Sequence, residues 1–245
     1  MELTRFDYSY ELKLCGRRLH APRAVDMSRL KRILRYVKGT LDYVITLSIK
    51  DTNDLKRLVG TSDPDWAGDP ESRKSSSVGT VSWGGCLISH FSRTQEVGAV
   101  SSPTAEFYAS CSLAGDMLHI SSILEDLGYP VENVIETDSS SGKSIALRRG
   151  LGRVRHLDVR ALWLQQLVAA RAVQIQKIPG AENRADVGTK LLDAKTLRRH
   201  LHSLGMRRFV NGEILDIEDG DAEGENDVDL VGQGDNYISL CKALT

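Results

Sequence analysis

The chain has 245 residues, of which 41% are hydrophobic, and a formal net charge of −1 at pH 7; this length suffices for one substantial hydrophobic core and a small appendage. Its apolar stretches are short and interrupted by charges, and residues 1–14 lack the apolar run of a signal peptide, so we expect no membrane span and no membrane partner. The four cysteines lie far apart without paired spacing, which argues against a zinc site or a disulfide framework and favours a reducing intracellular location, cytoplasmic or nuclear.

Charge is distributed unevenly along the chain. Residues 1–60 contain 13 Lys and Arg against 7 Asp and Glu, whereas residues 211–245 contain 1 against 10. A basic body permits a polyanionic partner. The acidic C-terminal segment is poor in apolar residues, so we predict a disordered tail over residues 209–245.

The first predicted element is a helix over residues 29–40, "RLKRILRYVKGT", which Gly39 ends. Its apolar residues share one predicted face: Leu30, Ile33, Leu34 and Val37. The basic residues between 31 and 38 either contact the backbone of a nucleic-acid duplex or form a solvated face, and the sequence leaves both interpretations open. A β-rich run, "YVITLSI", follows at 43–49. Residues 1–52 are too few for a sizeable core, so we predict a lead-in rather than an independent domain.

From residue 53 to residue 208 the pattern predicts one domain of strands and helices. "VGTVSWGG" and "CLISHFS" are typical of two strands joined by Gly84-Gly85, and Ser102 and Gly128 bound a long helix. The predicted strands cover residues 55–62, 78–83, 86–92, 133–138 and 173–179, and the predicted helices cover residues 102–128, 139–150, 156–172, 181–192 and 194–205. The fold class that follows is α/β (α+β), with a five-stranded mixed sheet flanked by helices.

Four acidic residues lie at the edges of these predicted elements. Asp63 ends the first strand, where Pro64 keeps it extended, and Glu106 lies in the first turn of the long helix. Asp138 closes the strand "NVIETD", and Asp186 precedes or begins a helical turn after the fifth strand. Because α/β folds gather sites where strands end and helices start, we expect these carboxylates to meet.

Converging carboxylates repel one another, and Mg²⁺ or Mn²⁺ removes that penalty because hard cations prefer oxygen ligands. Two such ions can activate a water and stabilise a leaving oxygen during phosphodiester cleavage. The alternative is that individual aspartates only shape turns, which is our interpretation of Asp65 and Asp69 in "SDPDWAGD". Since the chain has 33 acidic residues, one aspartate at a strand end is weak evidence by itself.

The region from residue 29 to residue 205 resembles the C-terminal end of copia-type retrotransposon polyproteins, in which the end of a reverse transcriptase is followed by a ribonuclease H domain. The matching stretches occur in the family's order: "LKRILRYVKGT", "SDPDWAGD", "RKSSSVG", "SSPTAEFYA", "TDSSSGKSIA", "RHLDVR" and "AENRADVGTK". The resemblance implies that residues 1–52 are a reverse-transcriptase remnant and that residues 53–208 form a ribonuclease H-like domain. No Tyr-x-Asp-Asp polymerase motif occurs in the sequence, so we expect no polymerase activity.

The resemblance also implies an active site of three aspartates and one glutamate. Carried over position by position, these catalytic and metal-binding residues are Asp63, Glu106, Asp138 and Asp186. The implied activity is hydrolysis of the RNA strand of an RNA/DNA hybrid with two Mg²⁺ or Mn²⁺ ions. The predicted substrate contacts are Ser139, Arg155 and His156, of which the last two match a basic-His-x-Asp segment of the family. The predicted protein partner is the reverse transcriptase portion of the parent polyprotein.

The chain departs from the family at several positions. Gly188 stands where a bulky apolar residue is usual, Ser139 stands where many members have Asn, and no histidine precedes Asp186 in "IPGAENRAD". Two other functions therefore stay open. One is a decayed transposon fragment that keeps the fold as a nucleic-acid-binding or inert module, and the other is a relative that cuts DNA.

Overall fold

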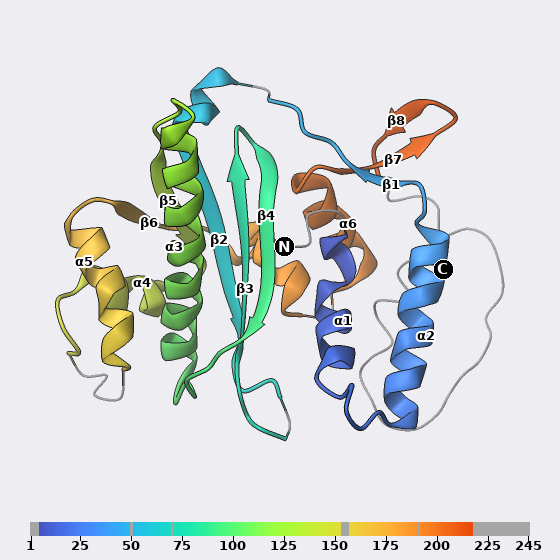
Figure 1. Cartoon of the computed structure of the whole chain (residues 1–245), viewed down its shortest axis with the longest axis horizontal. Coiled ribbons are helices and arrows are strands. Elements are labelled where there is room, and N and C mark those ends of the chain that lie inside the picture. Colours follow the sequence, from blue (N-terminus) through green and yellow to red (C-terminus); the bar gives the residue numbers. More distant parts are fainter. Residues whose placement is uncertain (1–4, 50, 70, 153–156, 191, 218–245) are drawn as a thin grey trace. The chain divides into compact units, whose positions relative to one another are not determined.

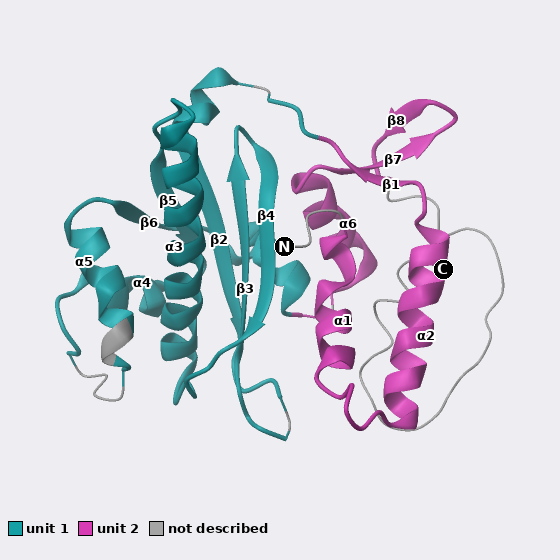
Figure 2. Cartoon of the chain, in the orientation of Figure 1, with its two compact units in different colours: residues 1–3, 47–189 teal, residues 4–46, 190–245 magenta. Residues whose placement is uncertain are grey.

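The computed structural model describes residues 5–49, 51–69, 71–152, 157–190 and 192–217. The chain forms two compact units, which are coloured separately in Figure 2: unit 1 comprises residues 1–3 and 47–189, and unit 2 comprises residues 4–46 and 190–245. The predicted boundaries at residues 52 and 208 therefore differ from the observed division. Within the described residues, no helix is both long enough and apolar enough to cross a membrane.

Unit 1 is built on a five-stranded mixed sheet, as predicted (Figure 1). Its strands are β2 (Arg57–Asp65), β3 (Ser76–Trp83), β4 (Cys86–Thr94), β5 (Glu132–Thr137) and β6 (Val173–Lys177). In space their order is β4-β3-β2-β5-β6. The β2-β3-β4 side is antiparallel, whereas β2, β5 and β6 run parallel, so the ends of β2 and β5 lie at one edge of the sheet.

The predicted hairpin between β3 and β4 is confirmed. Gly84 and Gly85 have φ angles of +58° and +78°, a backbone region in which side chains with a Cβ are disfavoured. Two consecutive left-handed residues give a two-residue hairpin whose twist matches that of the flanking strands.

The long helix α3 (Ser102–Asp126) packs against β2, β3 and β5. Its N-cap is Ser101, one residue before the predicted Ser102, and Gly128 follows its end with a φ of +88°. The helix lies close to the sheet, which glycine at position 60 of β2 permits. A Cβ added at Gly60 would come within 2.6 Å of the Met117 sulfur. The core between them is formed by buried apolar side chains, including Leu58, Val81, Phe107, Leu113, Met117 and Ile135.

The last part of unit 1 contains shorter helices. These are α4 (Ser140–Leu147), the 3₁₀ turn η3 (Val159–Leu162) and α5 (Trp163–Ala169), and another 3₁₀ turn, η2 (Thr52–Lys56), precedes β2. The predicted α-helix over residues 181–192 is wrong. The chain instead forms two 3₁₀ turns, η4 (Gly180–Glu182) and η5 (Arg184–Gly188), and Asn183 between them caps η5 by accepting a hydrogen bond from the Ala185 amide at 3.2 Å.

Unit 2 combines the two ends of the described chain. It contains η1 (Phe6–Tyr8), α1 (Ser9–Gly16), α2 (Ala24–Gly39), α6 (Ala194–Ser203), β1 (Tyr43–Ile45), β7 (Met206–Val210) and β8 (Glu213–Leu215). β1 pairs with β7 and β7 pairs with β8, so residues 206–210 complete a sheet that residues 43–45 begin. Residues 209–210 and 213–215, which fall within the predicted tail, lie in β7 and β8. Residues 218–245 lie outside the described part.

The predicted apolar face of α2 is only partly buried. Ile33 and Tyr36 are buried, and the Tyr36 hydroxyl donates a hydrogen bond of 2.5 Å to buried Asp7. Leu30 and Leu34, which we predicted on the same face as Ile33, are 37% and 59% exposed. The helix still ends at Gly39, as predicted. Its apolar residues therefore divide between a buried face and an exposed one.

Candidate metal centre at the sheet edge

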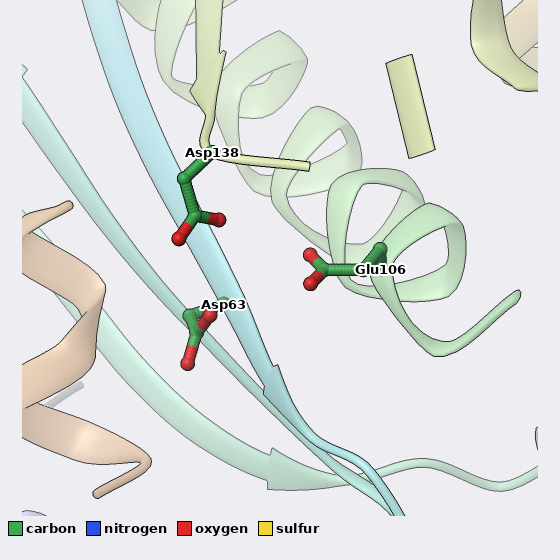
Figure 3. Close-up of side chains that lie close together, drawn as sticks. All are labelled: Asp63, Glu106 and Asp138. Atoms are coloured by element: carbon green, nitrogen blue, oxygen red, sulfur yellow. The ribbon is translucent and has the colours of Figure 1, made fainter. Parts of the chain in front are cut away.

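Three of the four predicted carboxylates come together. One carboxylate oxygen from each of Asp63, Glu106 and Asp138 lies within 4.8 Å of the corresponding oxygens of the other two residues. Figure 3 shows the three side chains pointing into a common space from a strand, a helix and the end of a second strand. Asp63 is only 3% exposed, and the other two residues are half-buried. The three carboxylates that we expected to meet thus lie together, and their role stays a prediction.

The register of the parallel strands brings the two aspartates together. Thr61 on β2 is paired with Glu136 on β5, and Asp63 and Asp138 each lie two residues further along. Side chains two residues apart on a strand point to the same face, so neighbouring parallel strands present this pair side by side. Asp138 directly follows β5, at the carboxyl end of a parallel strand, where α/β proteins place functional groups.

Glu106 is positioned by the start of α3. Gln95, just after β4, is buried, and its side-chain amide donates to the Ala105 carbonyl and to the Ser77 hydroxyl, both at 3.0 Å. These bonds attach the helical turn that carries Glu106 to strand β3. On the other side, a Cβ added at Gly142 of α4 would lie 3.0 Å from the Glu106 Cβ. Glu106 therefore sits between the sheet and the first turn of α4.

Asp63 is held from a second direction by a residue that the sequence reasoning missed. The Thr189 hydroxyl donates a hydrogen bond to Asp63 Oδ2, and both side chains are buried. Because the Thr189 hydroxyl is the donor and one Asp63 oxygen is the acceptor, this contact restricts the rotation of the Asp63 carboxylate. Thr189 lies in the quoted stretch "AENRADVGTK", three residues after Asp186. Its position in that stretch, close to Asp186, was the available indication that Thr189 belongs near the site.

Asp186 does not join the three-carboxylate group. It lies half-buried in η5, which packs against β2 and β3. Two contacts fasten this segment to β2: the Asn183 amide donates to the Ser62 carbonyl at 3.3 Å, and Thr189 bonds Asp63. The structure thus places Asp186 on a segment attached to the strand of Asp63, and its carboxylate is not part of the group whose oxygens all lie within 4.8 Å of one another.

Gly188 explains how closely η5 approaches the sheet. A Cβ at this position would come within 2.6 Å of Val78 Cγ1 on β3, where Val78 is fully buried and pairs with Asp63. The neighbouring Gly79 instead faces Leu113 of α3. Because successive strand residues point to opposite faces, η5 and α3 cover opposite sides of the sheet. Glycine at position 188, where we expected a bulky apolar residue, thus allows η5 to pack against Val78.

The predicted substrate contacts have different outcomes. Ser139 caps α4: its hydroxyl accepts a hydrogen bond of 3.0 Å from the Gly142 amide, which is a structural role. Arg155 and His156 lie outside the described residues. The interpretation of Asp69 as a turn former agrees with its contacts, since its carboxylate accepts hydrogen bonds from the Glu71 amide and the Ser72 hydroxyl.

The donor set suits a hard divalent cation. Two carboxylates separated by 4 to 5 Å repel each other by roughly 3 to 4 kcal/mol at an effective dielectric constant of 20. A cation between such groups converts that repulsion into attraction, and Mg²⁺ and Mn²⁺ take oxygen ligands of this kind. Since all three donors are carboxylates and Asp63 is buried, the cluster fits such an ion better than an exposed acidic surface would.

Comparison with known proteins finds Pol polyproteins of plant transposons among the relatives of this chain. The Pol polyprotein of transposon TNT 1-94 from Nicotiana tabacum is 31% identical over 194 residues, which are 78% of this chain and 14% of that polyprotein. The Pol polyprotein of transposon RE1 from Arabidopsis thaliana is 28% identical over 211 residues, 85% of this chain and 14% of that polyprotein. The chain thus spans about one seventh of the length of these relatives. No protein-family model matches it.

Among solved structures, the compost-derived LC11-RNase H1 matches with a TM-score of 0.38 and 17% identity, over 54% of this chain and 91% of that one. The RNase H1 of Halobacterium salinarum matches with a TM-score of 0.36 and 18% identity, over 53% of this chain and 90% of that one.

Proposed function

Because the chain belongs to the copia-type, retrovirus-related Pol polyproteins of transposons, we propose that unit 1 is a metal-dependent ribonuclease H that hydrolyses the RNA strand of RNA/DNA hybrids. The observation that supports this most is the meeting of Asp63, Glu106 and Asp138 at the sheet edge, from three distant parts of the sequence. Residues 4–46 of unit 2 would then be the remnant of the preceding reverse transcriptase, whose polymerase portion is the proposed protein partner.

In this proposal the three carboxylates would hold Mg²⁺ or Mn²⁺. Two such ions, when bound, supply an activated water and stabilise the leaving oxygen in phosphodiester cleavage. The protein contributes position rather than proton transfer. Thr189 fixes one oxygen of Asp63, Gln95 fixes the turn that carries Glu106, and the β2–β5 register places Asp138 beside Asp63. Such prearranged ligands avoid reorganisation during the reaction.

Asp186 is the proposed fourth member of the site. It lies on η5, and Thr189, three residues later, contacts Asp63 directly. This attachment of η5 to the strand of Asp63 supports the inclusion of Asp186. A fourth carboxylate oxygen would add to the coordination of a hard cation.

The substrate assignment follows from the family. An enzyme that cuts only the RNA strand must recognise 2′-hydroxyl groups across a shallow minor groove. The proposed contacts to that strand are Ser139, through the rim of the site at the start of α4, and Arg155 and His156. Arginine pairs with phosphate oxygens through charge-assisted hydrogen bonds.

The test uses the full chain with three labelled duplexes of one sequence: an RNA/DNA hybrid, a DNA duplex and an RNA duplex. We expect Mg²⁺-dependent cleavage of the RNA strand of the hybrid only, and none after chelation by EDTA. Asp138→Asn should lower cleavage on the order of 10³-fold, whereas Asp65→Asn, a matched change two residues from Asp63, should keep it.

Each other outcome selects a different function. Cleavage of duplex DNA would identify a DNA-cutting relative. Binding of the hybrid without cleavage under any metal condition would identify a decayed nucleic-acid-binding module. Equal cleavage by wild type and Asp138→Asn would show that the site has been assigned to the wrong residues.

A further inference from the structure

The outer surface of α2 carries an apolar stripe that the described chain does not cover. We call Met27, Leu30, Leu34 and Val37 the α2 stripe; their spacing of three, four and three residues puts them on one side of the helix. Met27 is 50% and Leu34 is 59% exposed. Isolated exposed apolar residues are ordinary, whereas a continuous apolar row bordered by polar residues indicates a binding surface.

A row of positive charge borders the α2 stripe. Lys31, Arg35 and Lys38 each directly follow a stripe residue, and all three are exposed. A step of one residue is a rotation of about 100° around an α-helix, so these cations form a second row beside the first. Among the described residues, none is seen to form an ion pair with this basic row. The surface therefore fits a ligand that is both acidic and apolar.

Residues 218–245 of the same chain have this composition. They contain eight Asp and Glu against a single basic residue, Lys242. Near the end, in "NYISLCKALT", Tyr237, Leu240 and Leu244 repeat the three-four spacing of the α2 stripe. The two apolar rows can therefore face each other, and the acidic residues complement the basic row electrostatically. A nucleic-acid backbone would match the charge but not the apolar stripe.

The connection is short enough to favour this contact. The described chain ends at Ile217, which is buried in unit 2, the unit that contains α2. The 19 residues between Ile217 and Tyr237 can span up to about 60 Å, whereas the 16 residues of α2 extend only about 24 Å. Tethering a segment at such a distance gives it a local concentration on the order of millimolar.

We propose that residues 218–245 dock on α2, with Tyr237, Leu240 and Leu244 against the α2 stripe and the acidic residues beside the basic row. Docking covers a cationic surface with the chain's own anionic segment. It thereby reduces non-specific binding of nucleic acid to unit 2. This inference is independent of the chemistry of unit 1, since it concerns residues remote in sequence from the carboxylate cluster.

Cysteine cross-linking in the full chain tests the contact, because Cys241 already lies within the proposed docking segment. In a Cys15→Ser background, we compare Leu34→Cys with Arg32→Cys, a control on the same helix about 160° away from Leu34. With a short bis-maleimide reagent and peptide mass spectrometry, we expect the Leu34→Cys variant to cross-link to Cys241 about tenfold more than the control. The yield should fall in 1 M NaCl, because salt screens the charge pairs.

Three results would overturn the proposal. Equal yields from the two variants would mean that the segment does not select the α2 stripe. Cross-links that join an isotopically labelled chain to an unlabelled one would assign the stripe to a second copy. A yield from Leu34→Cys that stays unchanged when Leu30→Asp is added would show that the apolar contact is absent; Leu30 is partly exposed, so this change leaves the fold intact.

Discussion

Two regions of unit 1 carry proposed metal ligands, and the structure holds them in different ways. Asp63, Glu106 and Asp138 project from β2, α3 and the end of β5, which are regular elements packed on one buried core. Asp186 projects from η5, a 3₁₀ turn fastened by the Asn183–Ser62 and Thr189–Asp63 hydrogen bonds. Regular elements fix a side chain through many backbone hydrogen bonds, whereas a turn depends on a few side-chain contacts.

This difference explains why three carboxylates meet and the fourth does not. The β2–β5 ladder and the N-terminal turn of α3 define the first three positions even without a ligand. The position of η5 depends on Thr189 and on the absence of a side chain at Gly188. We therefore expect changes in the first region to remove activity, and changes in the second region to tune it.

The largest effect is expected in the region of Asp63, Glu106 and Asp138, which regular elements hold and which we call the rigid region. Asp138→Asn removes a charge from the cluster while preserving its shape, so hybrid cleavage should fall on the order of 10³-fold, equivalent to about 4 kcal/mol of transition-state stabilisation. The melting temperature should not fall, because the change relieves repulsion between neighbouring carboxylates. Single-turnover cleavage and calorimetry measure the two quantities. A variant that retained wild-type rate would remove Asp138 from the site.

Acid should weaken the sheet beneath the rigid region. His90 on β4 is buried, and burial lowers its pKa from 6.5 to about 4. Between these values the unfolded chain binds a proton that the folded chain does not, so the free energy of unfolding falls as pH drops from 6.5 to 4. The total loss from this residue is about 3 kcal/mol. Above pH 6.5 both states are neutral and the contribution is constant.

Urea unfolding at several pH values measures this slope, and His90→Gln provides the comparison. The glutamine variant lacks the titrating ring, so its stability should depend less steeply on pH between 6.5 and 4. If both proteins lost stability in parallel over that interval, His90 would not be the buried group responsible.

Asp186→Asn should have an intermediate effect. We expect cleavage to fall about 10- to 100-fold, with most of the loss recovered at high Mg²⁺, because a more distant ligand affects metal affinity more than the arrangement of the others. A Mg²⁺ titration of the rate separates affinity from maximal rate. A loss as large as that of Asp138→Asn, with no recovery at high Mg²⁺, would show that Asp186 is as important for cleavage as Asp138.

The sequence predicted the rigid region for local reasons. Asp63 stands between a β-rich run and Pro64, Glu106 lies in the first turn of a strongly marked helix, and Asp138 closes a short apolar strand. Each of these positions follows from the pattern of its own segment. Their convergence then follows from the parallel arrangement of β2 and β5, which is common when helices connect strands.

The remaining features depend on contacts between distant segments. The predicted helix over residues 181–192 gave way to 3₁₀ turns because Asn183 bonds Ser62 and Gly188 packs on Val78, and neither contact is visible in a local pattern. Likewise, β1 pairs with β7, which lies more than 150 residues later in the chain. A local pattern therefore could not show that part of residues 1–52 belongs to unit 2. The Thr189–Asp63 bond is of the same kind.

Gly188→Ala tests how tightly η5 is seated. The added Cβ would lie 2.6 Å from Val78 Cγ1, so η5 or β3 must move, at a cost of about 1 to 3 kcal/mol in stability. Cleavage should fall together with stability, since η5 carries Asp186. Adding Val78→Ala removes the clashing methyl groups. A double-mutant cycle on the free energy of unfolding should then show a favourable coupling between the two changes; independent, additive losses would mean that the close approach is not a constraint.

The smallest effect is expected at the hydrogen bond that joins the two regions. Thr189→Val keeps the shape of the side chain but removes the donor to Asp63, which deprives the carboxylate of one hydrogen bond. A hydrogen bond to a charged group contributes about 1.5 to 3 kcal/mol, and the loss here is reduced because a metal ion can still orient Asp63. We therefore expect a rise in the Mg²⁺ concentration for half-maximal cleavage of about fivefold to tenfold, with little change in the rate at saturating Mg²⁺.

Thr189→Ser is the matched control, because it retains the hydroxyl and loses only a methyl group. Its Mg²⁺ requirement should stay close to that of wild type. If the serine and valine variants were equally impaired, the packing of the methyl group would be what matters. If neither differed from wild type, Asp63 would be fixed by β2 alone, and the rigid region would need no support from the turn.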